Sequence, residues 1–207
     1  MANKVFFFVP NIIGYLRIGI ALVAFCLMPS KQYAAFWLYI VSISLDMVDG
    51  HFARHLQQVS VFGSLLDMLI DRCTLLCMLT RLGLCYPSYA NVFSALTCLD
   101  ISSHWMYMYS SVLLGYKSHK IVDPEIGPLL MLYYGNPLFL DVVFYGSMTF
   151  FGLLYLVTIT PGPRVPGSAW GVWQLICVAC APVEIVQIVI NLSMLHTASF
   201  RMAAIDT

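Results

Sequence analysis

The chain has 207 residues, of which 60% are hydrophobic and only 10% are charged, and its mean hydropathy is +0.84. This composition excludes an ordinary soluble domain and is typical of an integral membrane protein. Because the basic and acidic residues balance to a net charge of zero, no basic surface is available to neutralise a phosphate backbone, which excludes a nucleic-acid-binding protein. We therefore expect lipids or small molecules as partners.

Six apolar runs are long enough to cross a bilayer, whose hydrocarbon core of ~30 Å takes roughly 20 helical residues. We predict spans over residues 12–28, 33–53, 63–84, 89–115, 139–159 and 169–195. The segment before the first run contains Lys4 and "VFFFV" but no small-residue cleavage site, so we predict an interfacial segment instead of a signal peptide. No internal repeat interrupts the chain, and we expect one all-α membrane domain over residues 1–207.

An even number of spans places both termini on the same side of the membrane. The loops on that side carry more basic residues than the opposite loops, as the positive-inside rule requires of the cytosolic side. We therefore predict cytosolic termini. The cytosolic set is Lys4, Arg54, Lys117, Lys120 and Arg201, against Lys31, Arg81 and Arg164 on the other side.

The second apolar run ends in an acidic helix face. Asp46, Asp49, Gly50 and Ala53 follow one another at offsets of three, four and seven residues, which share one side of an α-helix. A single Asp at a helix end is usually a cap or a solvated charge. Two acids beside small residues on one face indicate a binding site, because Gly50 and Ala53 leave room for a ligand to lie against the helix.

The third run continues this site. Asp67 and Asp71 lie one helical turn apart, after a connection in which Gly63 permits a tight turn or a close backbone approach. Four carboxylates near a low-dielectric slab repel one another strongly, so positive charge must lie beside them. Arg54 and Arg72 supply at most two charges, and divalent cations would supply the rest.

The ligand chemistry follows from these residue types. All-oxygen ligation suits Mg²⁺ or Mn²⁺ better than Zn²⁺, and two such ions would cancel four carboxylates. An EF-hand is excluded, because its ligands alternate along a loop. Arg54 has the geometry to hold phosphate oxygens bidentately. The combination predicts a diphosphate site with two metal ions.

The complete spacing, Asp46-x2-Asp49-Gly50-x2-Ala53-Arg54-x8-Gly63-x3-Asp67-x3-Asp71, resembles at every fixed position the signature of the CDP-alcohol phosphotransferases. These membrane enzymes join an alcohol to the phosphate of a CDP-activated partner and release CMP. The segments "FVPNIIGYLRI", "FGSLLDMLIDRC", "DISSHWMYMYSS", "SHKIVD" and "MAAID" resemble the branch of the family that uses inositol. The fold that this resemblance implies has six transmembrane helices and an N-terminal interfacial helix, usually in a homodimer, around a cytosol-facing cavity.

The resemblance also implies roles for individual residues. The reaction would be CDP-diacylglycerol plus myo-inositol giving phosphatidylinositol and CMP. Asp46 and Asp67 would each touch both metal ions, Asp49 one and Asp71 the other, with Asp71 also the general base. The residues implied for the CDP-diacylglycerol site are Gly50, Ala53, Arg54, Ser60 and Gly63. Residence in the endoplasmic reticulum, or the Golgi, rests on the same resemblance, and the Lys-rich tail expected after "MAAID" is missing from this sequence, which stops at Thr207.

The inositol pocket should offer several hydrogen-bond donors and acceptors, because the ligand is neutral and polyhydroxylated. Asp100 and His104 lie one turn apart on the fourth run, with Ser103 between them, and are candidates together with the cluster after that run. Two alternatives remain open, an interhelical polar pair at Asp100 and His104 and a lipid-headgroup anchor at the basic cluster. That cluster consists of Lys117, Ser118, His119 and Lys120.

Three further charged residues are predicted at membrane depth. We expect Arg17 to pair with one of the acids, give Asp141 no role, and leave Glu184 as a span-end or dimer-interface residue.

Two alternative functions also stay open. The acceptor alcohol could be glycerol phosphate, serine, choline or ethanolamine, since the metal motif does not distinguish alcohols. A divalent-cation transporter is the alternative from another class, since intramembrane acids also mark ion paths.

Overall fold

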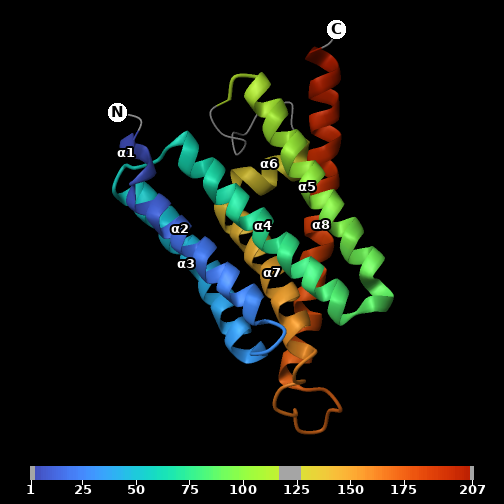
Figure 1. The fold of residues 1–207 in the computed structure, drawn as a ribbon. Helices are drawn as coiled ribbons and strands as arrows, with labels where there is room; N and C mark the ends of the chain where they lie inside the picture. Colours follow the sequence, from blue (N-terminus) through green and yellow to red (C-terminus); the bar gives the residue numbers. More distant parts are fainter. Residues whose placement is uncertain (1–2, 117–126, 206–207) are drawn as a thin grey trace.

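The computed structural model describes residues 3–116 and 127–205 (Figure 1), so the predicted Lys117 and His119 lie outside the described part of the chain. The described residues are almost entirely helical, with one isolated bridge between Arg164 and Gly171. The helices are α1 (Asn3–Phe6), α2 (Val9–Leu27), α3 (Gln32–His55), α4 (Val61–Cys85), α5 (Ala90–Leu113), α6 (Pro128–Gly135), α7 (Pro137–Val157) and α8 (Val172–Ile205), with a short 3₁₀ helix at Pro87–Tyr89.

Each predicted span coincides with one long helix, namely α2, α3, α4, α5, α7 and α8. Helix α8 continues ten residues beyond residue 195, where the last predicted span ends, to Ile205. Nothing stops it, since the sequence after 195 contains neither Gly nor Pro. The short helix α6 was not predicted either. It begins at Pro128, a residue favoured at the first helical position.

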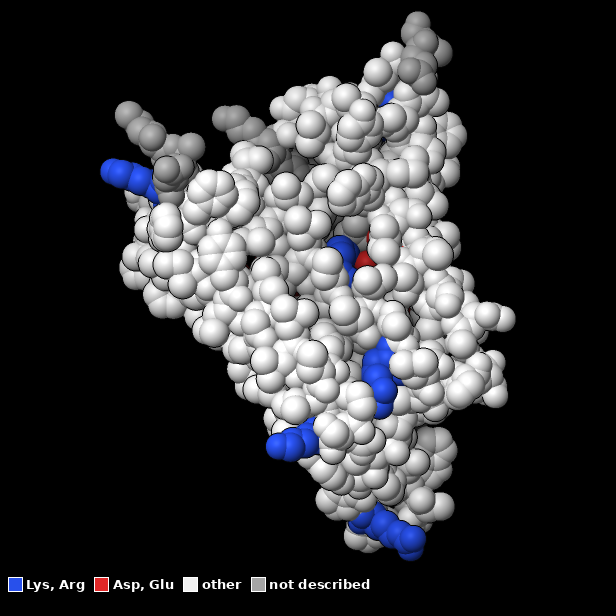
Figure 2. Space-filling model, viewed as in Figure 1, with Lys and Arg blue, Asp and Glu red and all other residues white. Residues whose placement is uncertain are grey.

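Several features show that the chain is a membrane protein. Among the described residues, three helices, α2, α7 and α8, are long and apolar enough to cross a bilayer. Large apolar side chains such as Leu22, Trp37 and Ile185 are exposed, and the face in Figure 2 carries few charged residues. The other three long helices, α3, α4 and α5, carry Asp46, Asp49, Asp67, Asp71 and Asp100. The count of six spans remains a prediction.

The helices form a bundle in which both termini lie at the same end (Figure 1). Helix α2 runs antiparallel to α3, α4 packs on α2, α5 and α7, and α8 packs on α5 and α7. The C-terminal end of α3 and the N-terminal end of α4 also lie at the end that holds the termini. The two acidic segments are therefore brought side by side in that half of the bundle.

Close packing of α2 on α4 depends on two glycines. A Cβ atom at Gly14 would lie 3.2 Å from Ile70 Cδ1, and one at Gly63 would lie 2.8 Å from Asn11 Oδ1. The second distance is shorter than real Cβ contacts. The predicted role of Gly63 in a close approach is thus seen directly, with the buried Asn11 side chain as the group approached.

The α3–α4 connection is held by side-chain hydrogen bonds. Ser60 caps α4, because its Oγ accepts a hydrogen bond from the Gly63 backbone N–H at 3.0 Å. Gln58 Oε1 accepts another from the Val9 N–H at 2.8 Å, which ties the start of α2 to the connection. These contacts fix where α2 enters the bundle beside the acids.

Candidate active site

One buried arginine joins all four predicted acids. Arg17 Nη1 lies 2.7 Å from Asp46 Oδ1, 2.9 Å from Asp49 Oδ2 and 3.1 Å from Asp67 Oδ1, and Nη2 lies 2.7 Å from Asp71 Oδ1. Arg17 is only 2% exposed. The helical spacings of α3 and α4 therefore bring four carboxylates to one point, which a guanidinium from α2 reaches.

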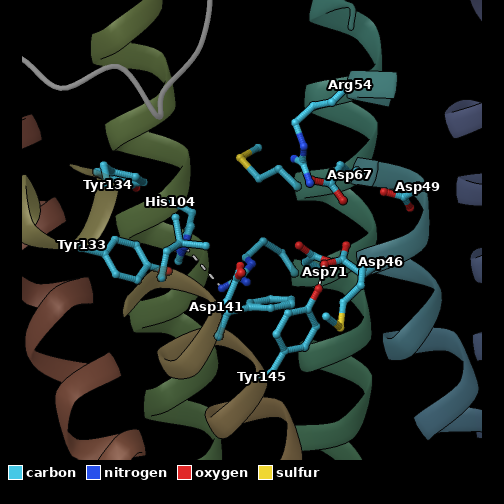
Figure 3. Close-up of a pocket in the computed structure, with 16 residues that line it drawn as sticks. Asp46, Asp49, Arg54, Asp67, Asp71, His104, Tyr133, Tyr134, Asp141 and Tyr145 are labelled. Carbon is cyan, nitrogen blue, oxygen red and sulfur yellow. Dashed lines mark hydrogen bonds between the residues drawn. The ribbon is translucent and has the colours of Figure 1, made fainter. Parts of the chain in front are cut away.

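Arg17 contacts all four acids, although the sequence indicated a single acidic partner for it and pointed to Arg54 and Arg72 as the compensating charges. In the structure Arg72 turns to Asp100 instead, whereas Arg54 extends toward Asp67 in Figure 3. The sequence pointed to Arg17 because it is a lone charge inside an otherwise apolar run. That it contacts four acids depends on how α2 packs.

The carboxylates form a candidate metal centre. Asp46, Asp49 and Asp67 each offer an oxygen atom, and these atoms lie within 4.8 Å of one another. Tyr145 from α7 donates a hydrogen bond of 2.6 Å to Asp46 Oδ2 and so orients that carboxylate (Figure 3). An all-carboxylate donor set of this kind fits Mg²⁺ or Mn²⁺.

A cavity of about 210 Å³ opens beside the acids. All four aspartates line it, and Figure 3 shows His104, Tyr133 and Tyr134 across the space from them. Asp141, which was predicted at membrane depth without a role, also lines this cavity. The full lining is Asp46, Met47, Asp49, Gly50, Arg54, Asp67, Met68, Asp71, Arg72, His104, Tyr133, Tyr134, Leu140, Asp141, Phe144 and Tyr145.

A second cavity, of about 230 Å³, lies between α2 and the α3–α4 connection. It shares four lining residues with the first cavity, so the two meet at the acids: Asp49, Gly50, Arg54 and Asp67. All residues predicted for the CDP-diacylglycerol site line this second cavity: Gly50, Ala53, Arg54, Ser60 and Gly63. The structure thus gathers these residues in one place, next to the candidate metal centre.

The far wall of the first cavity is a buried polar network. Arg72 Nη1 lies 2.8 Å from Asp100 Oδ1 and 3.3 Å from His104 Nε2. Asn191 of α8 donates to the same Asp100 oxygen at 3.3 Å, and Gln187 donates to Asn191 Oδ1 at 2.8 Å. Arg72 and His104 line the cavity, and Asp100 lies behind them as their common partner.

Asp100 and His104 were expected one turn apart, as inositol-pocket candidates or as a polar pair, but the sequence did not indicate the rest of this network. No sequence pattern indicates that Arg72 contacts Asp100, which lies 28 positions later, or that Asn191 of α8 contacts α5. Glu184 was expected at a span end or in a dimer interface. Its side chain is only 8% exposed and accepts a hydrogen bond from Ser147 of α7, so it packs inside the bundle, which argues against the dimer-interface interpretation. The span-end interpretation stays a prediction.

The fold and the site define the class of protein. It is a helical bundle with a membrane-facing surface, and its four-carboxylate centre lies where two cavities meet. Comparison with known proteins identifies the family. The model of the family described as CDP-alcohol phosphatidyltransferase matches residues 7–203, and the chain belongs to this family. Members of the family use divalent metal ions, which agrees with the carboxylate cluster.

Several curated proteins are similar to the chain. One, from Mus musculus, is 41% identical over 204 residues, covering 99% of this chain and 95% of the relative. Another, from Schizosaccharomyces pombe, is 36% identical over 98% of this chain and 92% of the relative. Both are named CDP-diacylglycerol–inositol 3-phosphatidyltransferase. No solved structure matches the chain.

Proposed function

We propose that this protein transfers the phosphatidyl group of CDP-diacylglycerol to myo-inositol and releases CMP. One observation carries the proposal: two cavities meet at a cluster of four carboxylates, one cavity lined by the residues expected for the CDP-lipid and the other closed by a polar wall. The relatives named above support inositol as the acceptor.

The carboxylates of the cluster would hold two Mg²⁺ or Mn²⁺ ions, which when bound stabilise the negative charge of the reacting diphosphate. The holding residues are Asp46, Asp49, Asp67 and Asp71. Three of them already present oxygens close enough to share one ion. Tyr145 keeps the Asp46 carboxylate oriented.

The second cavity would bind the CDP part of the lipid. Arg54 reaches from the end of α3 across Gly50, whose Cβ position would lie 3.6 Å from Arg54 Nη1. The guanidinium therefore lies at the junction of the two cavities, where it donates to phosphate oxygens. Ser60 and Gly63 form the opposite edge at the N-terminal end of α4, where the helix dipole favours an anion.

The first cavity would bind the acceptor. Asp71 lines it and is the residue we assign to take the proton from the attacking inositol hydroxyl. Arg72 and His104 would face the acceptor from the other side. Asp100 holds both, since its Oδ1 lies 2.8 Å from Arg72 Nη1 and its backbone oxygen lies 2.9 Å from His104 Nδ1. A wall of positioned donors and acceptors discriminates among alcohols by leaving buried groups unpaired when a hydroxyl is missing.

The setting of the enzyme is also part of the proposal. We place the acidic end of the bundle on the cytosolic side, together with both termini, in a six-span homodimer of the endoplasmic reticulum or Golgi. The small excess of basic residues in the loops predicted to be cytosolic supports this side of the membrane. The compartment and the homodimer rest on the family resemblance.

The alternative of a divalent-cation transporter finds no support in the packing. The half of the bundle away from the termini is filled by buried apolar side chains of α3, α4 and α7, including Tyr39, Met78, Leu82 and Tyr155. An ion path across the membrane would need polar groups there. Among the described residues, the acids that line the cavity lie in the half that holds the termini.

The test is CMP release by purified protein from CDP-diacylglycerol, with myo-inositol and with each alternative alcohol in turn. We expect release that depends on inositol, stops after chelation, and returns with Mg²⁺ or Mn²⁺. CMP release that depends on serine or glycerol phosphate would show that the protein uses that alcohol as its acceptor instead of inositol. Cation flux in proteoliposomes without CMP release would contradict the enzymatic function altogether.

A further inference from the structure

The guanidinium of Arg17 lies where a metal ion would bind. Its Nη1 atom lies within 3.1 Å of an oxygen of Asp46, Asp49 and Asp67. These are the same three carboxylates whose oxygens come within 4.8 Å of one another. A Mg²⁺ ion needs its oxygen ligands at about 2.0–2.1 Å. An ion bound by all three carboxylates would therefore occupy the position of Arg17 Nη1, and the two cannot be there at once.

Arg17 is held almost entirely by these acids. Nη2 bonds to Asp71, and Nε, which is buried, has no hydrogen-bond partner among the described residues. The backbone of this residue is fixed separately, because Ser42 Oγ donates to the Arg17 carbonyl oxygen at 3.1 Å. The side chain can therefore change position without disturbing the helix, once the charge of the carboxylates is neutralised by something else.

We infer that Arg17 is an internal counter-ion that holds the four aspartates together until divalent cations bind, and that it competes with those cations for the carboxylates. The inference rests on the proposed metal site and adds to it a residue that sets metal affinity. Like charges repel, so removing the guanidinium leaves a more negative site that binds a dication more tightly. The same removal leaves four carboxylates without their common partner and destabilises the protein when no dication is added.

The experiment measures Mn²⁺ binding by the electron paramagnetic resonance signal of free Mn²⁺, with purified full-length protein and no lipid substrate. Arg17→Gln should bind Mn²⁺ about tenfold more tightly than the wild type. Arg17→Lys keeps the positive charge and should bind Mn²⁺ with nearly the wild-type affinity. The matched control is Arg81→Gln, which removes another bundle arginine that donates to the Met28 carbonyl oxygen and not to an acid.

A second measurement uses thermal unfolding. Saturating Mn²⁺ should raise the unfolding temperature of Arg17→Gln more than that of the wild type or Arg81→Gln, since tighter ligand binding stabilises more. Unchanged or weaker Mn²⁺ binding by Arg17→Gln would overturn the role of Arg17 and leave the proposed function standing. Failure of the wild type and all variants to bind Mn²⁺ would overturn both.

The wild type provides a test that does not depend on any variant folding. A structure determined with Mn²⁺ bound at the aspartates should show Arg17 Nη1 displaced from Asp46, Asp49 and Asp67. Retention of all three contacts beside the bound metal would show that the arginine and the cation do not compete.

Discussion

Arg72 of α4 and Asp100 of α5 form an ion pair of 2.8 Å, and His104 Nε2 lies 3.3 Å from the same Arg72 nitrogen. Asp100 is 4% exposed and His104 8%. Buried charges persist in proteins when they are paired and hydrogen-bonded. This pair is completed by Asn191 of α8, so three helices fix the position of Arg72 and His104 at the wall of the first cavity.

His104→Ala should therefore raise the KM for myo-inositol by about tenfold, the effect of losing one to two kcal/mol of hydrogen bonding. The KM for CDP-diacylglycerol should stay near its wild-type value, because the second cavity does not include this residue. Steady-state kinetics with each substrate varied in turn checks this. The control is Trp105→Phe, the next position on α5, which is 57% exposed and does not line the first cavity. A raised KM for CDP-diacylglycerol alone would remove His104 from the acceptor pocket.

Asp71→Asn should lower kcat by at least about 100-fold, because the amide cannot accept the proton of the attacking hydroxyl. Binding of CDP-diacylglycerol should remain measurable in a direct binding assay. Asp141→Asn is the matched control, since Asp141 also lines the cavity but none of the ion pairs of the acidic cluster includes it. We expect it to keep most of the turnover. Near-normal turnover in Asp71→Asn would refute the assignment of the base.

Arg54→Ala should weaken the binding of CDP-diacylglycerol and of CMP by about 1.5–3 kcal/mol, the range for a lost hydrogen bond to a charged group. The measurement is the Kd of CMP by calorimetry in detergent. His55→Ala provides the control, because this neighbouring residue lines neither cavity. Equal CMP affinity in Arg54→Ala and the wild type would argue against a contact between Arg54 and the diphosphate.

Gly63→Ala should destabilise the protein by about 1–3 kcal/mol through overpacking. The added Cβ would lie 2.8 Å from Asn11 Oδ1 and 3.0 Å from Ser60 Oγ, so the start of α2 or the cap of α4 must shift. Gly19→Ala is the control, because nothing lies within 4 Å of its Cβ position, and it should be neutral or stabilising. Thermal unfolding compares the two variants, and equal unfolding temperatures would show that the close approach carries no cost.

Much of the site was predictable because it is encoded locally. The offsets among Asp46, Asp49, Gly50 and Ala53 are helical, and so is the offset between Asp67 and Asp71, so each helix presents its acids on one face whatever the rest of the chain does. Long apolar runs likewise predicted the six long helices. Helix α8 extends past the predicted span because apolarity sets the length of a membrane span, whereas a helix ends only where a breaker or a cap ends it.

Other parts of the site depend on contacts between distant segments. Arg72 could be expected near the acids from its position after Asp71, yet its side chain leaves the helix in another direction and meets α5. Tyr145 gave no signal at all, because a tyrosine in an apolar helix is ordinary, and only the packing of α7 brings its hydroxyl to Asp46. The same holds for Asn191, whose partner is 91 residues away.

The amino-acid sequence by itself determined the kind of protein, the helices and the four carboxylates, since composition and helical periodicity are properties of short stretches of chain. Only the tertiary structure decided which cationic side chain pairs with those carboxylates. Arg17 lies in a different helix from all four acids, and a charge reaches them only when α2, α3 and α4 pack closely enough for one guanidinium to contact every one.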